Sequence, residues 1–272
     1  MSGQVACPCC GSTDLGQGFA YDAPPEGETR FPVAPEEYRR EYRVCGVCGH
    51  WLGVTELDLA ALYERDYVDA TYSQEGLATT YERIMSLPPE RSDNVQRVTR
   101  IQEFWADRRE RSVLDVGSGL GVFPARMKQA GWTCTAVDPD ERATAFLRDH
   151  VGVVAVCGDF FALEDLDRFP LVTLNKVLEH VSDPMAMLAH ARSFLEPGGV
   201  LYLEVPDGER AAQDAEGAGR EEFFIEHLHV FAPASLAVLV QRAGFELDQL
   251  ARLREPSGKY TLYAFCGPRN PT

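Results

Sequence analysis

A glycine-rich turn at residues 117–121 constrains the fold of this 272-residue chain more than any other feature. The turn follows the apolar run Val113–Val116, and its three glycines are spaced G-x-G-x-G. Glycine lets the backbone turn without a Cβ clash and approach a bound ligand closely. A dinucleotide-binding fingerprint would have its third glycine at position 122, where this chain has Val122. The segment predicts a strand that runs through a tight turn into a helix, either as a ligand site or as a simple βα turn.

Acidic residues stand at the ends of the next two predicted strands. Asp138 follows the run 133–137 and lies 17 residues beyond the last glycine of the turn. An acid in that place can accept hydrogen bonds from ribose hydroxyls. Asp159 and Phe160 follow the run 153–157, where they suit an adenine amino group and the face of its ring. Both strand ends therefore favour an adenosine-containing ligand.

Asp115 adds a charge preference to the glycine turn, because it lies two residues before the first glycine. Its carboxylate would repel a pyrophosphate but suits a ligand that carries an ammonium group. S-adenosylmethionine (SAM) has an amine at its methionyl end and a cationic sulfur. The turn and the acids that follow it together favour SAM.

Two more apolar runs, at 171–174 and 199–205, bring the β-like segments to five, and helix-like segments separate them. This alternation predicts βαβ units and a parallel sheet. Open α/β sheets bind ligands at the carboxyl ends of their strands, which is where these acids and glycines stand.

Five motifs resemble those of class I SAM-dependent methyltransferases, in the family's order. They are LDVGSGLG, VDPD, CGDF, NKVLEHVSDP and FLEPGGVLYLEVP, and the resemblance extends from about residue 91 to the C-terminus. It implies an α/β fold with a doubly wound, Rossmann-like sheet of seven strands, the last antiparallel, whose final hairpin spans 245–253 and 259–266. The cofactor-binding residues that it implies are Asp115, Gly117, Ser118, Gly119, Gly121, Asp138, Pro139, Asp159, Phe160, Asn175 and Val177.

Two C-x-x-C-G knuckles near the N-terminus form the second strong signal. Paired knuckles can bring four thiolates to one tetrahedral zinc ion, so we expect a small zinc ribbon with one structural Zn²⁺. Its ligands would be Cys7, Cys10, Cys45 and Cys48, with Cys9 as a bystander. The alternative is two disulfides or free thiols, which the lack of a signal peptide makes less favourable. The other cysteines are expected to be small buried hydrophobes: Cys134, Cys157 and Cys266.

The chain divides into three expected parts. These are a zinc-ribbon module at 1–56, a helical connecting segment at 57–110, and a SAM-binding core at 111–272 with an acceptor-site insert near 206–232. Composition rich in glycine, proline or small polar residues predicts loops at 16–35 and 206–220.

Within the connecting segment, Ser92 or Asp93 is placed to cap a helix. The family resemblance implies that this segment lies over the cofactor. Tyr72 and Arg97 would then reach the methionyl carboxylate, and the alternative is that they face solvent or pack on the core.

The chain is strongly acidic, with a formal net charge of −16 and a pI of about 4.8. Such a surface disfavours nucleic acid, since phosphate contacts need a basic face. No apolar run is long enough to span a membrane. We therefore expect a cytoplasmic protein whose partner is a small-molecule or glycan acceptor, without nucleic-acid or membrane partners.

The segment Glu226–Phe231 carries the expected acceptor chemistry. Its pattern E-H-x-x-x-F is similar to that of sugar and natural-product methyltransferases. Sugar C-methyltransferases also have an N-terminal cysteine zinc site and a similarly placed Glu–His pair. An imidazole is well matched to accepting a proton near neutral pH, so we expect His227 to be a general base, oriented by Glu226 or a nearby carboxylate. His229 is the main competitor, and His180 is expected in the cofactor floor.

The resemblance favours O-methylation of a hydroxyl on a sugar, glycan or secondary metabolite, because the chain lacks the long extra C-terminal domain of sugar C-methyltransferases. Sugar C-methylation is the first alternative, and methylation of a ribosomal-RNA base is the second. A non-catalytic SAM-binding protein is the least favoured interpretation, since the motif set is complete.

Overall fold

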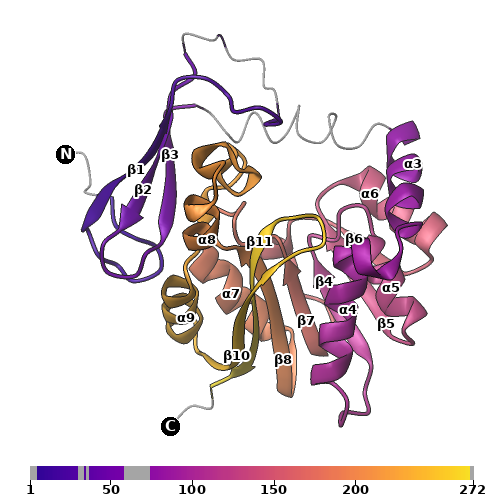
Figure 1. The fold of residues 1–272 in the computed structure, drawn as a ribbon. Coiled ribbons are helices and arrows are strands. Elements are labelled where there is room, and N and C mark those ends of the chain that lie inside the picture. Colours follow the sequence, from indigo (N-terminus) through magenta and orange to yellow (C-terminus); the bar gives the residue numbers. More distant parts are fainter. Residues whose placement is uncertain (1–4, 30–33, 35–36, 58–73, 270–272) are drawn as a thin grey trace.

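The computed structural model describes residues 5–29, 34, 37–57 and 74–269, so Tyr72 lies outside the described part of the chain. Figure 1 shows a central sheet with helices on both sides and an N-terminal module (residues 5–57) next to it. None of the described helices is long and apolar enough to cross a membrane.

The central sheet has seven strands in the order β10-β11-β8-β7-β4-β5-β6. Their bounds are β4 Ser112–Val116, β5 Thr133–Asp138, β6 Val154–Cys157, β7 Phe169–Asn175, β8 Leu195–Pro206, β10 Phe245–Arg254 and β11 Tyr260–Pro268. The pairs from β8 to β6 are parallel, whereas β11 is antiparallel to both β8 and β10. This arrangement confirms the seven-stranded α/β sheet with an antiparallel last strand.

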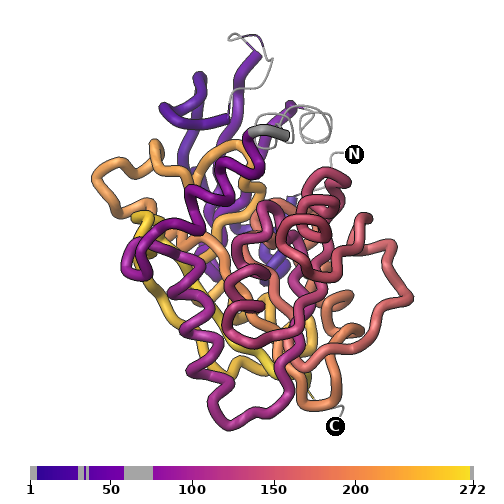
Figure 2. The backbone as a smooth tube through the Cα atoms, turned by 90° about the vertical axis from the view of Figure 1, so that its right-hand side faces the viewer, coloured from indigo at the N-terminus to yellow at the C-terminus, as the bar shows by residue number. Residues whose placement is uncertain are grey.

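Helices cover the two faces of the sheet in separate groups. Their bounds are α3 Gln74–Met85, α4 Asp93–Phe104, α5 Val122–Gln129, α6 Glu141–Phe146, α7 Pro184–Ser193, α8 Gly208–Gln213 and α9 Pro233–Arg242. In Figure 1, α4 and α5 lie on one side of the sheet and α7 and α9 on the other. Figure 2 is viewed from the side of α4 and α5, which lie in front of the strands.

Successive residues of the buried strands contribute to different core layers. Val113 of β4 packs with Ile101 of α4 and Met127 of α5. The next residue, Leu114, belongs to the cluster that includes Leu188 of α7. Since neighbouring strand side chains point to opposite faces, a continuous apolar run fills both layers of a sheet covered on two sides.

The N-terminal module contributes three strands to a four-stranded sheet in the order β1-β2-β3-β9. Its bounds are β1 Leu15–Tyr21, β2 Arg40–Cys45, β3 Trp51–Thr55 and β9 His229–Val230. Strand β9 comes from the expected acceptor-site insert: Trp51 pairs with Val230 and Leu52 with His229. The module and the insert therefore share one sheet.

Both loop predictions need correction. Residues 16–21 belong to β1, because pairing with β2 overrides the glycines in that stretch. The segment 206–220 contains α8, which Asp207 caps by accepting a hydrogen bond from the backbone N of Arg210, and a 3-10 turn at residues 217–219. A side-chain cap of this kind stabilises a helix start even in a small, polar sequence.

The predicted cap of α4 is confirmed for Ser92, whose hydroxyl accepts a hydrogen bond from the backbone N of Val95. Cys134 and Cys266 are buried as expected. Cys157 is exposed, which contradicts its expected burial, because it ends β6 at the edge of the sheet.

Candidate functional site

The glycine turn after β4 has the backbone that its sequence predicts. Gly117, Gly119 and Gly121 have φ angles of 71°, 50° and 74°, in the left-handed region that favours glycine. A Cβ on Gly117 would lie 2.8 Å from Cγ2 of Val177, and one on Gly121 would lie 2.6 Å from Cδ2 of Leu147. The turn therefore packs too closely against its neighbours to accept other residues at these two positions.

A cavity of about 880 Å³, hereafter the larger cavity, opens next to this turn at the carboxyl ends of β4, β5 and β6. The predicted cofactor residues that line it are Gly117, Gly119, Asp138, Pro139, Asp159, Phe160 and Val177. The carboxylate of Asp138 accepts hydrogen bonds from the backbone N of Gly119 at 2.8 Å and of Asp140 at 3.0 Å. Asp138 thus joins the turn to the end of β5. The volume of the larger cavity is suitable for a small-molecule cofactor.

Four predicted cofactor residues, Asp115, Ser118, Gly121 and Asn175, are not part of this lining. The carboxylate of Asp115 accepts hydrogen bonds from the hydroxyl of Thr173 at 2.7 Å and the side-chain N of Asn175 at 2.9 Å. Burial raises the pKa of Asp115 to about 6. Oδ1 of Asn175 is buried and has no hydrogen-bond partner within the described residues. This group is a polar support for the turn and leaves one acceptor atom available.

Arg97 pairs with a buried carboxylate in the structure. Its guanidinium lies 2.5 Å from Oε2 of Glu204 and donates to the side-chain O of Asn94 at 2.8 Å. Arg100 contacts the other oxygen of Glu204 at 2.5 Å. Burial alone would raise the pKa of Glu204, but the two guanidinium groups lower it to about 2. Arg97 is buried and pairs with Glu204 in the core, as the core-packing alternative expects.

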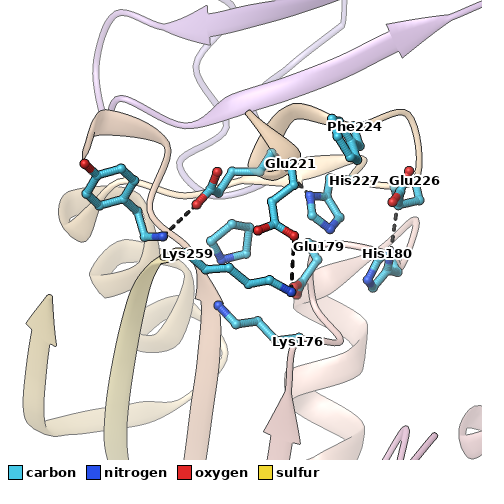
Figure 3. A pocket seen from close by; sticks show the side chains of 11 residues that line it. Lys176, Glu179, His180, Glu221, Phe224, Glu226, His227 and Lys259 are labelled. Atoms are coloured by element: carbon cyan, nitrogen blue, oxygen red, sulfur yellow. Dashed lines mark hydrogen bonds and ion pairs between the residues drawn. The ribbon is translucent and has the colours of Figure 1, made fainter. Parts of the chain in front are cut away.

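A smaller cavity of about 260 Å³ adjoins the larger one, since Lys176 and His180 line both. Its lining, drawn in Figure 3, is rich in charged side chains. The remaining lining residues are Glu179, Pro206, Glu221, Glu222, Phe224, Glu226, His227, Lys259 and Tyr260. This cavity combines the segment after β7 with the expected acceptor-site insert.

The imidazole of His227 lies at the wall of the smaller cavity and is held in its neutral form. Its Nδ1 lies 2.9 Å from the backbone O of Glu222, and a carbonyl oxygen only accepts, so Nδ1 carries the proton. Nε2 then has a lone pair. Burial, with His180 nearby, keeps the pKa of His227 well below the ordinary value. The ring is therefore unprotonated at neutral pH and able to accept a proton at Nε2.

The structure changes the expected surroundings of His227. The group that bonds Nδ1 is the backbone of Glu222, at the short 3-10 turn Glu221–Phe223, and not the expected carboxylate of Glu226. Glu226 lines the cavity, and its backbone O accepts a hydrogen bond from Nδ1 of His180 at 2.9 Å. His180 itself lines both cavities.

His229 is not one of the residues that line the smaller cavity. It is buried in β9, where its Nδ1 lies 3.1 Å from Nε2 of His50 in the N-terminal module. Pairing of β9 with β3 sets this direction, and the structure thereby separates His229 from its competitor His227.

The four predicted metal ligands come together in the N-terminal module. Ligand atoms of Cys7, Cys10, Cys45 and Cys48 all lie within 4.8 Å of one another. The Sγ atoms of Cys7 and Cys48 are 3.5 Å apart, as are those of Cys10 and Cys45. These distances are too long for disulfides, whose S–S bonds measure about 2.05 Å. They are close to the spacing of about 3.8 Å between sulfurs around a tetrahedral zinc ion with Zn–S bonds of about 2.3 Å.

Several residues of the smaller cavity, Lys176 among them, were given no role by the sequence analysis. Lys176 has a φ of 60°, which makes it the single non-glycine residue with positive φ in the described ranges, and its ammonium donates to the hydroxyl of Thr261 at 2.5 Å. Glu179 is almost fully buried, and its Oε2 has no hydrogen-bond partner within the described residues. Both lie in the motif NKVLEHV, so their place after β7 was the available signal.

Comparison with known proteins gives one family. A family model described as a methyltransferase domain matches residues 90–250. The ubiquinone biosynthesis O-methyltransferase of Thiobacillus denitrificans is 28% identical over 164 residues, which cover 54% of this chain and 71% of that protein. The protein of the same name from Xanthomonas axonopodis pv. citri is 32% identical over 159 residues, covering 53% of this chain and 66% of that protein.

One solved structure has a similar fold over a larger share of this chain than these two relatives match. The 1,6-didemethyltoxoflavin-N1-methyltransferase of Burkholderia thailandensis, solved with its substrate and S-adenosylhomocysteine, superposes with a TM-score of 0.58. The two chains are 21% identical, and the match covers 90% of this chain and all of the other. At this identity the likeness concerns the fold.

Proposed function

Because this chain belongs to the methyltransferase-domain family, we propose that it transfers the methyl group of SAM to a hydroxyl on a sugar, glycan or secondary metabolite. The observation that carries the proposal is the junction of the two cavities, which share Lys176 and His180. One has the size and residues for the cofactor, and the other presents a neutral histidine. The relatives named as O-methyltransferases support oxygen as the acceptor atom.

In this proposal the larger cavity holds SAM. The closely packed glycine turn lets the backbone approach the cofactor, and the carboxylate of Asp138 accepts hydrogen bonds from the ribose hydroxyls. Asp159 and Phe160, which also line the cavity, bind the adenine. Bound there, SAM supplies a methyl group activated by a cationic sulfur.

The smaller cavity holds the acceptor. Four glutamates and two lysines line it, and Tyr260 and Phe224 provide its aromatic surface. Two of its glutamates are paired, Glu221 with Lys259 at 3.2 Å and Glu222 with Arg220 at 2.9 Å. A charged lining of this kind suits an acceptor with many hydrogen-bonding groups and disfavours a large apolar one. A sugar-like or polyhydroxylated acceptor therefore fits it best.

His227 removes the proton from the acceptor hydroxyl. Nδ1 would stay bonded to the backbone O of Glu222, and Nε2 would take the hydroxyl proton as the acceptor oxygen gains the methyl group. The bond between the methyl carbon and the cofactor sulfur would break in the same step, so that the sulfur leaves as a neutral thioether. The protein mainly aligns the acceptor with the methyl group, and such alignment contributes roughly 7–11 kcal/mol in well-oriented reactions. A positioned base adds about 10²- to 10⁴-fold.

We also propose that the cysteine cluster binds one structural zinc ion. The observation behind this proposal is the clustering of the four thiols, with spacings close to those of a tetrahedral zinc site. Four cysteine ligands would leave no coordination position for a substrate. The proposed role is to stabilise the N-terminal module.

The test is an acceptor screen with isotopically labelled SAM. The purified protein is incubated with sugars, nucleotide sugars, phenolic metabolites and ribosomal RNA, and the labelled product is analysed by mass spectrometry and NMR. A label on an oxygen of a hydroxylated acceptor is the expected result. A label on a sugar carbon would favour C-methylation instead, and transfer only to ribosomal RNA would refute the proposal.

A further inference from the structure

The segment that carries His227 is bound along its backbone by the N-terminal module. Between residues 223 and 230, main-chain groups of this segment meet side chains or main-chain groups of the module. The hydrogen bonds are Arg40 Nη1 to Phe223 O at 2.8 Å, Ile225 N to Glu28 Oε1 at 2.8 Å, Tyr42 Oη to His227 O at 2.6 Å and Gly53 N to Leu228 O at 2.9 Å. The ladder between β3 and β9 continues this contact.

Tyr42 makes the contact nearest to the proposed base. Its hydroxyl donates to the backbone O of His227, and the backbone O of Phe224 lies 3.1 Å from the same hydroxyl. Tyr42 is fully buried, and burial raises the pKa of its phenol, so the hydroxyl keeps the proton that it donates. One side chain of β2 thus donates its single hydroxyl proton at the turn that presents His227, with the shorter contact at His227 itself.

A buried ion pair between Arg40 and Glu28 contacts the backbone of the same segment. Glu28 is buried and accepts hydrogen bonds from Arg40 and Tyr38 as well as from the backbone N of Ile225. Arg40 in turn donates to Phe223. The carboxylate and the guanidinium hold the backbone of residues 223–225 rigidly, because breaking one of these contacts would leave a buried charge without a hydrogen-bond partner.

Gly53 shows how close the two parts lie. A Cβ on Gly53 would be 3.2 Å from the backbone O of His227 and 3.4 Å from that of Leu228. The neighbouring backbone would have to move by a few tenths of an ångström to make room. A methyl group at this position therefore acts directly on the backbone of the proposed base.

We propose that the N-terminal module positions the catalytic histidine, and that Tyr42 is the positioning residue through which it does so. The inference rests on the proposed role of His227. The methyltransferase core also contacts this segment, but at the residue after the histidine: the backbone O of Glu179 accepts a hydrogen bond from the backbone N of Leu228 at 2.7 Å. The module supplies a contact at the backbone O of His227, while the ring is held through Nδ1 by the backbone O of Glu222.

The test compares Tyr42→Phe, which removes one hydroxyl, with Tyr263→Phe as the matched control. The Tyr263 hydroxyl accepts from Gln249 on the exposed side of the β10–β11 hairpin, away from the His227 segment. The readouts are kcat, the dissociation constant of SAM, and amide hydrogen exchange over residues 223–230. Gly53→Ala serves as an independent second variant.

Tyr42→Phe is expected to lower kcat by about 10-fold, the effect of one lost buried hydrogen bond of about 1.4 kcal/mol on a positioned group. We expect the affinity for SAM to stay within about twofold of that of the unaltered protein. Amide hydrogen exchange over residues 223–230 should be faster, because exchange reports how often that segment opens. Tyr263→Phe is expected to change none of the three. Gly53→Ala is expected to lower kcat with SAM affinity retained.

Unchanged kcat and exchange in Tyr42→Phe would overturn the inference, and so would an equal loss of SAM affinity and kcat, which indicates general destabilisation. His227→Ala separates this result from failure of the proposed function. If His227→Ala is inactive while Tyr42→Phe is fully active, only the positioning role fails. If His227→Ala keeps its turnover, the proposed base is wrong and the inference fails with it.

Discussion

Glu179 and His227 approach each other in the smaller cavity (Figure 3). A carboxylate O of Glu179 and a ring N of His227 lie within 4.8 Å of each other. The backbone O of Glu179 accepts hydrogen bonds from Leu228 at 2.7 Å and His229 at 3.2 Å. Glu179 therefore fixes the chain that follows His227 and places a carboxyl group near its ring. Once the imidazole has taken a proton, an ionised carboxylate at this distance stabilises the cation.

The first prediction is that Glu179→Gln slows the reaction without weakening SAM binding. Loss of about 1–3 kcal/mol of charge stabilisation corresponds to a decrease in kcat of about 5- to 150-fold. The acid limb of the kcat–pH profile should also move to lower pH, because a nearby negative charge no longer favours the imidazolium. Glu246→Gln, on the exposed part of β10, is the matched control. Equal profiles for both variants would contradict the prediction.

The second prediction concerns His227→Ala. If Nε2 of His227 accepts the acceptor proton, turnover should fall by roughly 10²- to 10⁴-fold, while a residual rate remains because alignment survives. SAM affinity, measured by calorimetry, should stay the same. His150→Ala, a change in a partly exposed histidine outside both cavities, should be active. Near-normal turnover of His227→Ala would exclude this residue as the base.

The third prediction is a shift in the pH dependence of catalysis. Only the neutral imidazole can accept a proton, so activity is lost as pH falls through the pKa of His227. Burial lowers this pKa well below its ordinary value, and the loss should therefore begin below the pH of about 6.5 at which an exposed histidine titrates. The measurement is kcat/KM for the acceptor across pH. An acid limb at or above pH 6.5 would conflict with a buried, neutral base.

The fourth prediction is that Asp138→Ala weakens SAM binding by about 1.5–3 kcal/mol, the range for a hydrogen bond to a charged group. Asp138 lines the larger cavity at the end of β5. Asp248→Ala on exposed β10 is the control. Calorimetry with SAM checks the prediction, and unchanged affinity in a folded Asp138→Ala protein would remove Asp138 from the site.

The fifth prediction is that the purified protein contains about one zinc ion per chain, the number that one four-cysteine site holds. Cys48→Ser should lose the metal, because it removes one of the four clustered thiols. Cys157→Ser, a change in an exposed cysteine outside the cluster, should keep it. Metal analysis of anaerobically purified protein decides, and a metal-free protein with all four thiols intact would refute the site.

The sequence was sufficient to predict the sheet because its signals are local. An apolar run, a glycine turn and an acid at the strand end each reflect the backbone of a few neighbouring residues, as Gly117 and Asp138 illustrate. The four cysteines were also predictable, since two knuckles with suitable spacing have few other ways to arrange their thiols.

The surroundings of His227 were not predictable in the same way. The hydrogen bond between Tyr42 and His227 joins residues that are 185 positions apart in the sequence. No local sequence pattern around either residue predicts this contact. The bond between Nδ1 of His227 and the backbone O of Glu222 depends on a 3-10 turn that brings this carbonyl to the ring, and turns of this length have weak sequence signals. Likewise, only the pairing of β9 with β3 directs His229 toward His50.

The pairing of β3 with β9 also has a consequence for biosynthesis. Residues 51–55 emerge from the ribosome long before residues 229–230, so β3 has an open edge while the whole central part of the chain is made. A contact between such distant residues forms late, because closing a long loop is entropically unfavourable until other structure brings its ends together. The smaller cavity would then be among the last parts of the protein to assemble. Substitutions along the edge of β3 should consequently reduce the yield of folded protein during synthesis more than they reduce the stability of molecules that have already folded.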